Sequence, residues 1–180
     1  PSNATDAGSL LLAALDDPNP VLVLEHKLLY KQSFEVPDEF PPARLGEGRI
    51  EREGTDLTIV ATSVEVQRSV QAAEQLAEQG ISAEVIDPRT IKPLDVPLIL
   101  QSVARTGRVL LVQEAPKFAG FMAEVAATIA ESEVFGDLQA PIRRLCGLDT
   151  PIPYSPTLEK ASVPQVDDIV REAAALVGEW

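Results

Sequence analysis

The residues with the clearest chemical potential lie where predicted strands end. His26, the only histidine of the chain, closely follows the short apolar run Val21–Leu24. The ends of parallel strands are where α/β proteins place their ligand sites. Glu25 and His26 are neighbours, however, so their side chains point to opposite faces if the strand continues. We therefore interpret His26 as a polar strand end at a subunit surface and not as a catalytic residue.

Carboxylates also end two later strands. Glu114 follows the apolar run Val109–Val112 and precedes a turn into a helix, so it can bind a ligand or cap that helix. Capping is the simpler interpretation. Asp87 and Arg89 stand on either side of Pro88 at the end of another strand. This spacing predicts a local ion pair with a structural role.

An oxygen-rich turn lies between Asp16 and Pro20. The carbonyl oxygens at the end of a helix lack partners and carry partial negative charge, and Asp17 and Asn19 add side-chain oxygens. Such a set suits a hard monovalent or divalent cation. From the chemistry alone, however, an ordinary helix stop is the favoured interpretation.

Several other kinds of site are disfavoured. No G-x-G-x-x-G or Walker loop joins a strand to a helix, and Gly46 and Gly48 lead into charged, strand-like sequence, which argues against dinucleotide binding. Cys146 is the only cysteine, so it forms no internal disulfide and no thiol cluster for a metal. The net charge of −13 disfavours nucleic acid and favours a basic protein partner. No apolar run approaches the ~20 residues that cross a membrane.

Residues 1–30 predict one helix and one strand. Asp6 is a candidate N-cap for a helix over residues 7–15, because its carboxylate can accept backbone N–H groups. The segment Asp16–Pro20 ends the helix, since neither of its prolines can continue the hydrogen-bond ladder. The apolar run Val21–Leu24 then predicts a buried parallel strand. One helix and one strand cannot enclose a core, so we expect their other side to be covered by chain that this sequence does not contain.

Residues 31–54 carry prolines and glycines among charged residues and predict an extended linker, with a short strand pair near Arg49–Glu51. Downstream, strands and helices alternate. The expected strands are 57–61, 83–86, 109–112 and 142–146, and the expected helices are 64–79, 95–106, 121–132 and 164–177, the last capped by Ser162. This order predicts an α/β fold with a doubly wound, mostly parallel sheet and helices on both faces.

Several segments, taken in order, resemble one family. They are Asp6–Leu11, Asp16–Pro20 and Glu25–Tyr30, then Glu84–Asp95, then Gln113–Ala115 with Gly120 and Glu124, and finally Ala140–Arg144, Gly147–Tyr154 and Leu158–Glu159. Together they resemble the β subunits of thiamine-diphosphate-dependent 2-oxo acid dehydrogenases. The resemblance covers essentially the whole chain. It implies three parts: the end of a pyrimidine-binding domain over residues 1–30, a linker over 31–54, and a transketolase-type C-terminal domain over 55–180.

The resemblance also implies a reaction. Enzymes of this family are α2β2 tetramers that decarboxylate a 2-oxo acid on thiamine diphosphate, with magnesium, and pass the acyl group to lipoyl-lysine of a dihydrolipoamide acyltransferase. The family's catalytic glutamate and histidine lie upstream of the segment that matches Pro1, and His26 does not match the catalytic histidine's motif. We therefore assign no catalytic and no cofactor-binding residue here, and expect the chain to be inactive alone.

Two further roles follow from the resemblance. Family β subunits hold a structural potassium ion at the turn that matches Asp16–Pro20, which implies ligands from the backbone carbonyl of Ala14 and from Asp17 and Asn19. The C-terminal domain builds the subunit interface with the α subunit and a second β subunit. Its end also helps to dock the basic peripheral-binding domain of the acyltransferase. The acidic balance and the tail Gly178–Trp180 fit that role electrostatically.

Two other interpretations stay open. A transketolase or 1-deoxyxylulose-phosphate synthase shares the C-terminal fold, but Glu25–Tyr30 and Gly147–Tyr154 fit the dehydrogenases better. A non-catalytic assembly module is the second, and the uncovered apolar face expected for residues 1–30 argues against it. Pyruvate, branched-chain 2-oxo acids and acetoin are all served by this family, and the sequence does not select among them. The single cysteine fits a reducing compartment, so the expected location is cytoplasmic.

Overall fold

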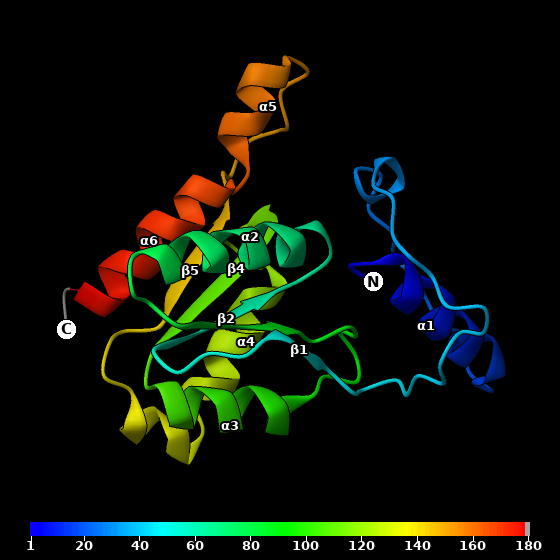
Figure 1. Cartoon of the computed structure of the whole chain (residues 1–180), viewed down its shortest axis with the longest axis horizontal. Helices are drawn as coiled ribbons and strands as arrows, with labels where there is room; N and C mark the ends of the chain where they lie inside the picture. The colour runs from blue at the N-terminus through cyan, green and yellow to red at the C-terminus, as the bar shows by residue number, and fades with distance from the viewer. Residues whose placement is uncertain (179–180) are drawn as a thin grey trace.

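A computed structural model describes residues 1–178, and Figure 1 shows one sheet with helices on both sides. The strand order is β1-β3-β2-β4-β5, in which β1 is antiparallel to β3 and the other neighbours are parallel. The strands are β1 Arg49–Arg52, β2 Leu57–Ala61, β3 Ala83–Asp87, β4 Val109–Pro116 and β5 Arg143–Gly147. The predicted doubly wound, mostly parallel sheet is confirmed.

Two helices cover each face of the sheet. Helices α2 (Val64–Glu78) and α6 (Val166–Gly178) cover one face, and α3 (Val96–Thr106) and α4 (Phe121–Ala130) cover the other. Successive strand residues point to opposite faces, so Ile59 packs with α2 and α6, whereas Val60 packs with α3 and α4. The three central strands β2, β3 and β4 therefore need apolar residues on both sides.

The helix ends in this part follow the sequence signals. Asp95 caps α3 by accepting a hydrogen bond from the backbone N–H of Leu98 at 3.1 Å. Gly107 ends the same helix with a φ of 67°, and its N–H donates to the carbonyl oxygen of Val103 at 2.8 Å. These are the local contacts that satisfy the unpaired groups at helix ends.

The last quarter of the chain differs from the prediction. A short helix, α5 (Pro156–Ser162), was not predicted, and α6 begins at Val166 rather than near Pro164. Ser162 ends α5, and its hydroxyl donates to the carbonyl oxygen of Glu159 at 2.8 Å, so its predicted role as the cap of α6 was wrong. Proline at the first position of α5 favours a helix start that apolar periodicity does not reveal.

The amino-terminal arm (residues 1–45) lies beside the sheet region (residues 46–178), as Figure 1 shows. Its helix α1 (Ala4–Asp16) starts earlier than predicted. Asn3 and not Asp6 is the N-cap, because Asn3 Oδ1 accepts the backbone N–H of Asp6 at 2.9 Å. A single 3-10 turn, η1 (Leu29–Lys31), follows later. A second 3-10 segment, η2 (Glu133–Asp137), lies in the sheet region.

The strand predicted at Val21–Leu24 does not form. Leu22 is 90% exposed and Leu24 is 68% exposed, so this apolar run faces solvent in the chain as it stands. A strand needs a neighbour for its backbone N–H and C=O groups, and residues 1–178 place none beside this run.

The strand pair predicted within the linker, near Arg49–Glu51, was wrong. The short strand near Arg49–Glu51 is not half of a separate pair, because β1 joins the edge of the main sheet through β3. Within residues 1–178, no helix is both long and apolar enough to cross a membrane.

Candidate functional site

The carboxyl ends of β2 and β4 mark the point where the winding of the sheet reverses. After β2 the chain crosses to β3 on one side, whereas β4 lies on the other side. The crevice at such a point is the usual ligand site of an open α/β sheet. Ser63, in the turn from β2 to α2, has a φ of 56°, which is rare outside glycine and marks a strained turn.

Four charged or titratable side chains meet at this edge. Arg68 of α2 contacts two carboxylates, since its Nη1 lies 2.5 Å from Glu65 Oε1 and 3.3 Å from Glu114 Oε1. The same nitrogen donates to the carbonyl oxygen of Pro164 at 3.0 Å. His26 Nε2 lies 2.5 Å from Glu114 Oε2, and this contact joins the arm to the sheet region.

Glu65 is the most deeply buried of these four side chains. Its side chain is 1% exposed, and its Oε2 has no hydrogen-bond partner. Burial raises the pKa of Glu65 to about 7, because Arg68 offsets only part of the desolvation, and Glu114 and Asp168 add negative charge nearby. Glu65 therefore exchanges a proton near neutral pH.

The hydrogen bonds of His26 identify the nitrogen that carries its proton. Nδ1 accepts a hydrogen bond from the backbone N–H of Leu28 at 3.2 Å, so in the neutral ring the proton sits on Nε2 and points to Glu114. His26 was predicted to be a strand end at a subunit surface. The structure instead places it in a loop of the arm, where its Nε2 contacts Glu114 at the carboxyl end of β4.

Glu114 does not cap helix α4, so that prediction was wrong. Its neighbour Gln113 does so, because Gln113 Oε1 accepts the backbone N–H of Met122 at 2.8 Å. Gln113 Nε2 also donates to the carbonyl oxygen of Pro116 at 2.9 Å. A Cβ at Gly120 would lie 2.5 Å from the backbone oxygen of Pro116, as well as 1.9 Å from Gln113 Nε2, so a side chain at this position would force the backbone to shift.

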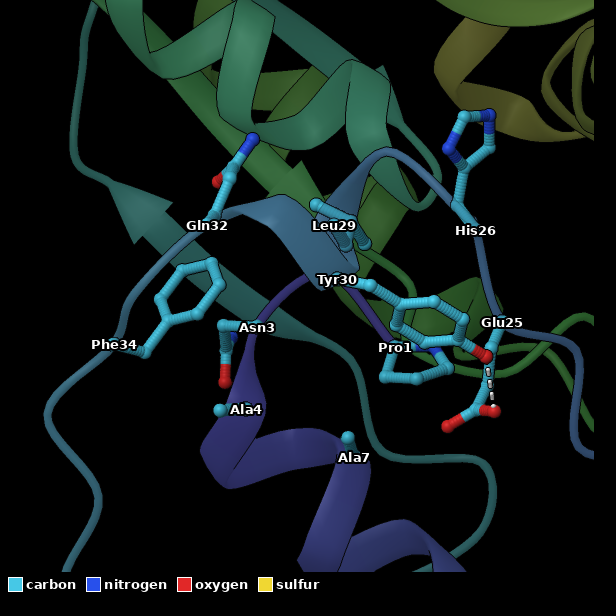
Figure 2. A pocket seen from close by; sticks show the side chains of 10 residues that line it. All are labelled: Pro1, Asn3, Ala4, Ala7, Glu25, His26, Leu29, Tyr30, Gln32 and Phe34. Atoms are coloured by element: carbon cyan, nitrogen blue, oxygen red, sulfur yellow. Dashed lines mark hydrogen bonds between the residues drawn. The ribbon is translucent and has the colours of Figure 1, made fainter.

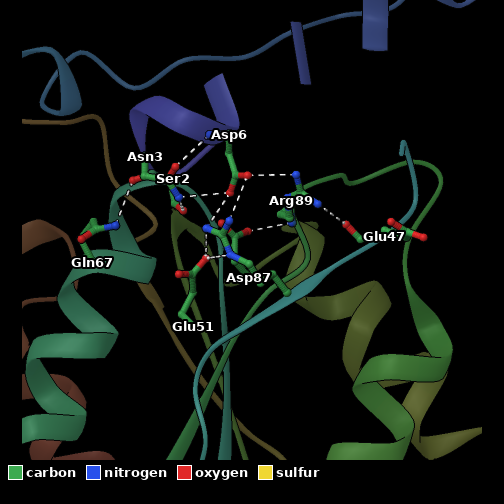
Figure 3. Close-up of polar contacts among 9 residues, drawn as sticks. Ser2, Asn3, Asp6, Glu47, Glu51, Gln67, Asp87 and Arg89 are labelled. Atoms are coloured by element: carbon green, nitrogen blue, oxygen red, sulfur yellow. Dashed lines mark hydrogen bonds and ion pairs between the residues drawn. The ribbon is translucent and has the colours of Figure 1, made fainter. Parts of the chain in front are cut away.

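A second polar cluster lies between α1 and the antiparallel edge of the sheet (Figure 3). The predicted local pair between Asp87 and Arg89 is a backbone contact, in which the N–H of Arg89 donates to Asp87 Oδ1 at 2.7 Å. The guanidinium of Arg89 pairs instead with Asp6 of α1, at 2.9 Å. Arg49 contacts Asp6 and Glu51. Burial raises the pKa of both Glu51 and Asp87.

A cavity of about 310 Å³ opens between α1 and the loop that carries His26. Figure 2 shows Asn3, Tyr30 and Phe34 around it, with the hydroxyl of Tyr30 donating to Glu25. That bond is 2.7 Å long, joins two exposed side chains and raises the pKa of Tyr30. The cavity is lined mainly by the arm, so its shape depends on how the arm is held.

The predicted potassium ligands lie at the carboxyl end of α1. The helix ends at Asp16, so the carbonyl oxygen of Ala14 in its last turn has no partner within the helix. Asp17 Oδ1 accepts the backbone N–H of Asn19 at 2.8 Å and its side-chain amide at 3.0 Å. A shallow hollow beside them is also lined by Arg44. The oxygen donors fit a monovalent cation in type, although Asn19 turns its amide nitrogen, not its oxygen, toward Asp17.

Sequence reasoning missed Glu65, Arg68 and the partner of His26. The sequence did contain a signal for Glu65 and Arg68. They are three residues apart at the start of a helix that follows a buried strand, and side chains with this spacing lie next to each other on a helix. The contact between His26 and Glu114 joins positions 88 residues apart, and no local pattern predicts it. Of the tail Gly178–Trp180, predicted to help in docking, Gly178 ends α6, and residues 179–180 lie outside the described residues.

One known protein family matches the part of the chain that forms the sheet region. The family described as "Transketolase, C-terminal domain" matches residues 46–169, which include all five strands. The chain belongs to this family. The match begins just before β1, so the amino-terminal arm lies outside it.

Curated relatives of this transketolase C-terminal domain protein match the arm as well. The chain is 46% identical over 175 residues to the mitochondrial pyruvate dehydrogenase E1 component subunit beta-1 of Arabidopsis thaliana, covering 95% of this chain and 48% of the relative. It is 41% identical over 179 residues to the β subunit of an acetoin:2,6-dichlorophenolindophenol oxidoreductase of Bacillus subtilis (strain 168), covering 99% of this chain and 52% of the relative. The predicted family resemblance is confirmed, and the chain spans about half the length of these relatives.

Among solved structures, a split-gene transketolase described as an inactive β4 tetramer matches with a TM-score of 0.66 and 26% identity. The match covers 76% of this chain and 43% of that one. It supports the transketolase-type fold of the sheet region independently of the sequence relatives.

Proposed function

We propose that this chain is the C-terminal half of the β subunit of a thiamine-diphosphate-dependent 2-oxo acid dehydrogenase. The observation that carries the proposal is the 46% identity to a pyruvate dehydrogenase β subunit, which extends over 95% of the chain and so includes the arm as well as the sheet region. A shared transketolase-type domain alone would leave the arm without matches.

In this proposal the chain serves assembly. The exposed apolar residues of the arm, Leu12, Leu15, Leu22 and Leu24, pack against the remainder of the β subunit, which also covers the backbone of residues 21–24. The sheet region forms contacts with the α subunit and the second β subunit of an α2β2 tetramer. Its acidic surface, with a net charge of −13 for the whole chain, favours the basic peripheral-binding domain of a dihydrolipoamide acyltransferase.

Two bound groups belong to the same proposal. Thiamine diphosphate, with magnesium, supplies the carbanion chemistry of the oxidative decarboxylation when bound to the holoenzyme. We assign no catalytic residue to this chain, because the catalytic glutamate and histidine of the family it resembles lie upstream of the segment that matches Pro1. Ala14, Asp17 and Asn19 are proposed to hold a potassium ion that stabilises the end of α1. A cytoplasmic location is also part of the proposal and rests on the single cysteine.

The test uses the full-length protein purified together with its partners from the source cells. We expect an intact mass of the β chain near twice the 19.3 kDa of this sequence, and a co-purifying α subunit. Addition of thiamine diphosphate and magnesium should give decarboxylation of pyruvate or of a branched-chain 2-oxo acid, or oxidation of acetoin with 2,6-dichlorophenolindophenol as acceptor. The present chain alone is the control and should be inactive. A complex inactive on all three substrates would refute the proposal.

A second candidate function is self-assembly without chemistry. It is favoured by the solved relative, whose description names an inactive tetramer of β chains. Sedimentation of the isolated chain distinguishes the two: a stable tetramer that fails to bind α subunit supports the assembly module, whereas capture by α subunit supports the dehydrogenase.

A further inference from the structure

We propose that Asp6, Arg49 and Arg89 form an electrostatic clasp that fixes the amino-terminal arm on the antiparallel edge of the sheet. The three residues come from α1, from β1 and from the turn after β3. They lie far apart in the sequence, and their ion pairs join α1 to the edge of the sheet; Figure 3 shows Asp6 beside Arg89.

Asp6 uses both of its carboxylate oxygens in the clasp. Arg49 Nη1 donates to Asp6 Oδ1 at 3.1 Å, and Arg49 Nη2 lies 2.8 Å from Asp6 Oδ2, which is a two-pronged contact. Arg89 Nη2 donates to Asp6 Oδ1 at 2.9 Å. Charge-assisted and two-pronged contacts of this kind are about twice as strong as neutral hydrogen bonds. The Asp6 side chain is only 2% exposed, so water screens the attraction weakly.

Apolar contact does not explain how α1 is held. Leu10 is its only buried hydrophobic side chain, whereas Leu11, Leu12 and Leu15 are 47%, 51% and 73% exposed. The other buried residues of the helix are Asp6 and Ser9. The face that α1 turns to the sheet region is therefore mostly polar, and its charged contacts there come from Asp6.

Arg89 depends on Asp6 more than Arg49 does. Within residues 1–178, Asp6 is the one carboxylate in ion-pair contact with Arg89, while Arg49 also pairs with Glu51 at 2.5 Å. Arg89 is held at a φ of 59°, a conformation that costs free energy outside glycine. The N–H bond to Asp87 fixes this backbone and aims the guanidinium at α1. Without Asp6, a mostly buried cation would lose its counter-ion, which is strongly unfavourable.

The same cluster does not form a metal site. Oxygens of Asp6, Glu51 and Asp87 lie within 4.8 Å of one another, a spacing that a cation could bridge. Two guanidinium groups already supply positive charge there, and they would repel a metal ion. Asp6 and Glu51 instead pair with the two arginine side chains, and Asp87 accepts the backbone N–H of Arg89.

Hydrogen exchange of the whole 180-residue chain, followed by mass spectrometry, tests the clasp. An undocked helix of 13 residues is only marginally stable in water, so opening of the clasp exposes the amides of α1 to exchange. Asp6→Asn keeps the size of the side chain and removes its charge. We expect the α1 amides to exchange at least tenfold faster in Asp6→Asn and in Arg89→Gln, with β2 and β4 unchanged.

The double variant and a matched control make the test specific. Asp6→Asn combined with Arg89→Gln should exchange no faster than the more damaged single variant, because the two residues act through one contact. Glu47→Gln removes the exposed pair with Arg44, at 3.4 Å, and should leave α1 unaffected. Unchanged α1 exchange in Asp6→Asn overturns the proposal, as do additive single effects or an equal loss of protection in β2 and β4.

Discussion

In the sheet region, strands β2 and β3 and the first five residues of β4 are completely buried, whereas in the arm α1 buries only Asp6, Ser9 and Leu10. The sheet region follows the ordinary rule that apolar burial supplies most of the stabilisation. The arm is attached mainly by polar side chains, at Asp6 and at His26, and leaves large apolar residues exposed. The difference indicates that the sheet region is held together mainly by apolar packing, whereas the arm is held on it mainly by polar contacts.

Truncation of the core should give the largest effect. Leu111 of β4 is fully buried against the helices α3 and α4. Leu111→Ala should therefore lower the free energy of unfolding by about 2–5 kcal/mol. Leu24→Ala is the matched variant in the arm, where 68% exposure predicts a change within about 0.5 kcal/mol. Urea denaturation followed by circular dichroism measures both. Equal effects of the two variants would remove the distinction between the regions.

The pH dependence of stability should reveal the buried Glu65. Its pKa is about 7 in the folded chain, against 4.5 for a solvated glutamate, so between these values the folded chain keeps a proton that the unfolded chain has lost. Stability therefore falls as the pH rises from about 4.5 to about 7, and levels off above. Glu65→Gln should be more stable than the wild type at pH ~8, by at most on the order of 3 kcal/mol, and similar to it near pH ~4.

Glu84 provides the control for Glu65. It is equally buried, but its carboxylate accepts a hydrogen bond from Ser102 at 2.5 Å and pairs with Arg105. Glu84→Gln should therefore lower stability at pH ~8, by about 1–3 kcal/mol. If thermal or urea unfolding showed the same sign for Glu65→Gln and Glu84→Gln, the unpartnered oxygen of Glu65 would have no energetic consequence.

The smallest effects should come from the loop of the arm. His26→Gln removes the contact with Glu114 and should cost about 1 kcal/mol of local stability, seen as faster tryptic cleavage at Lys27 and Lys31. Tyr30→Phe breaks the exposed bond to Glu25 in the same loop and should change the rate little, since exposed polar contacts contribute less. A larger effect of Tyr30→Phe than of His26→Gln would indicate that the exposed bond between Tyr30 and Glu25 holds the loop more strongly than the contact with Glu114.

The sequence predicted the sheet region better than the arm for a physical reason. Buried strands and helix ends are encoded by neighbouring residues, and the helix predicted over residues 95–106 agrees with α3 (Val96–Thr106) to within one residue. The prediction of a strand at Val21–Leu24 was wrong, because a strand also needs a neighbouring strand to pair with, and residues 1–178 do not provide one.

The polar contacts were harder still to predict. Arg89 was paired with Asp87 on grounds of proximity in sequence, but its guanidinium reaches Asp6, which lies 83 residues away. His26 and Glu114 were each identified as candidate residues, yet nothing in their local sequence indicated that they contact each other. Long-range polar pairs depend on the final packing of elements, and not on periodicity or capping signals.

The two outer strands of the sheet have a consequence for the behaviour of the protein in concentrated solution. An edge strand offers unpaired backbone groups to any passing chain, and this is a common route to fibrous aggregates. Here β1 reads Arg49-Ile50-Glu51-Arg52 and is bent by a register shift, and β5 begins with Arg143-Arg144. Charged residues in both outer strands, together with the register shift in β1, disfavour pairing with another chain. The hydrophobic strands between them can therefore be nearly continuous without promoting aggregation.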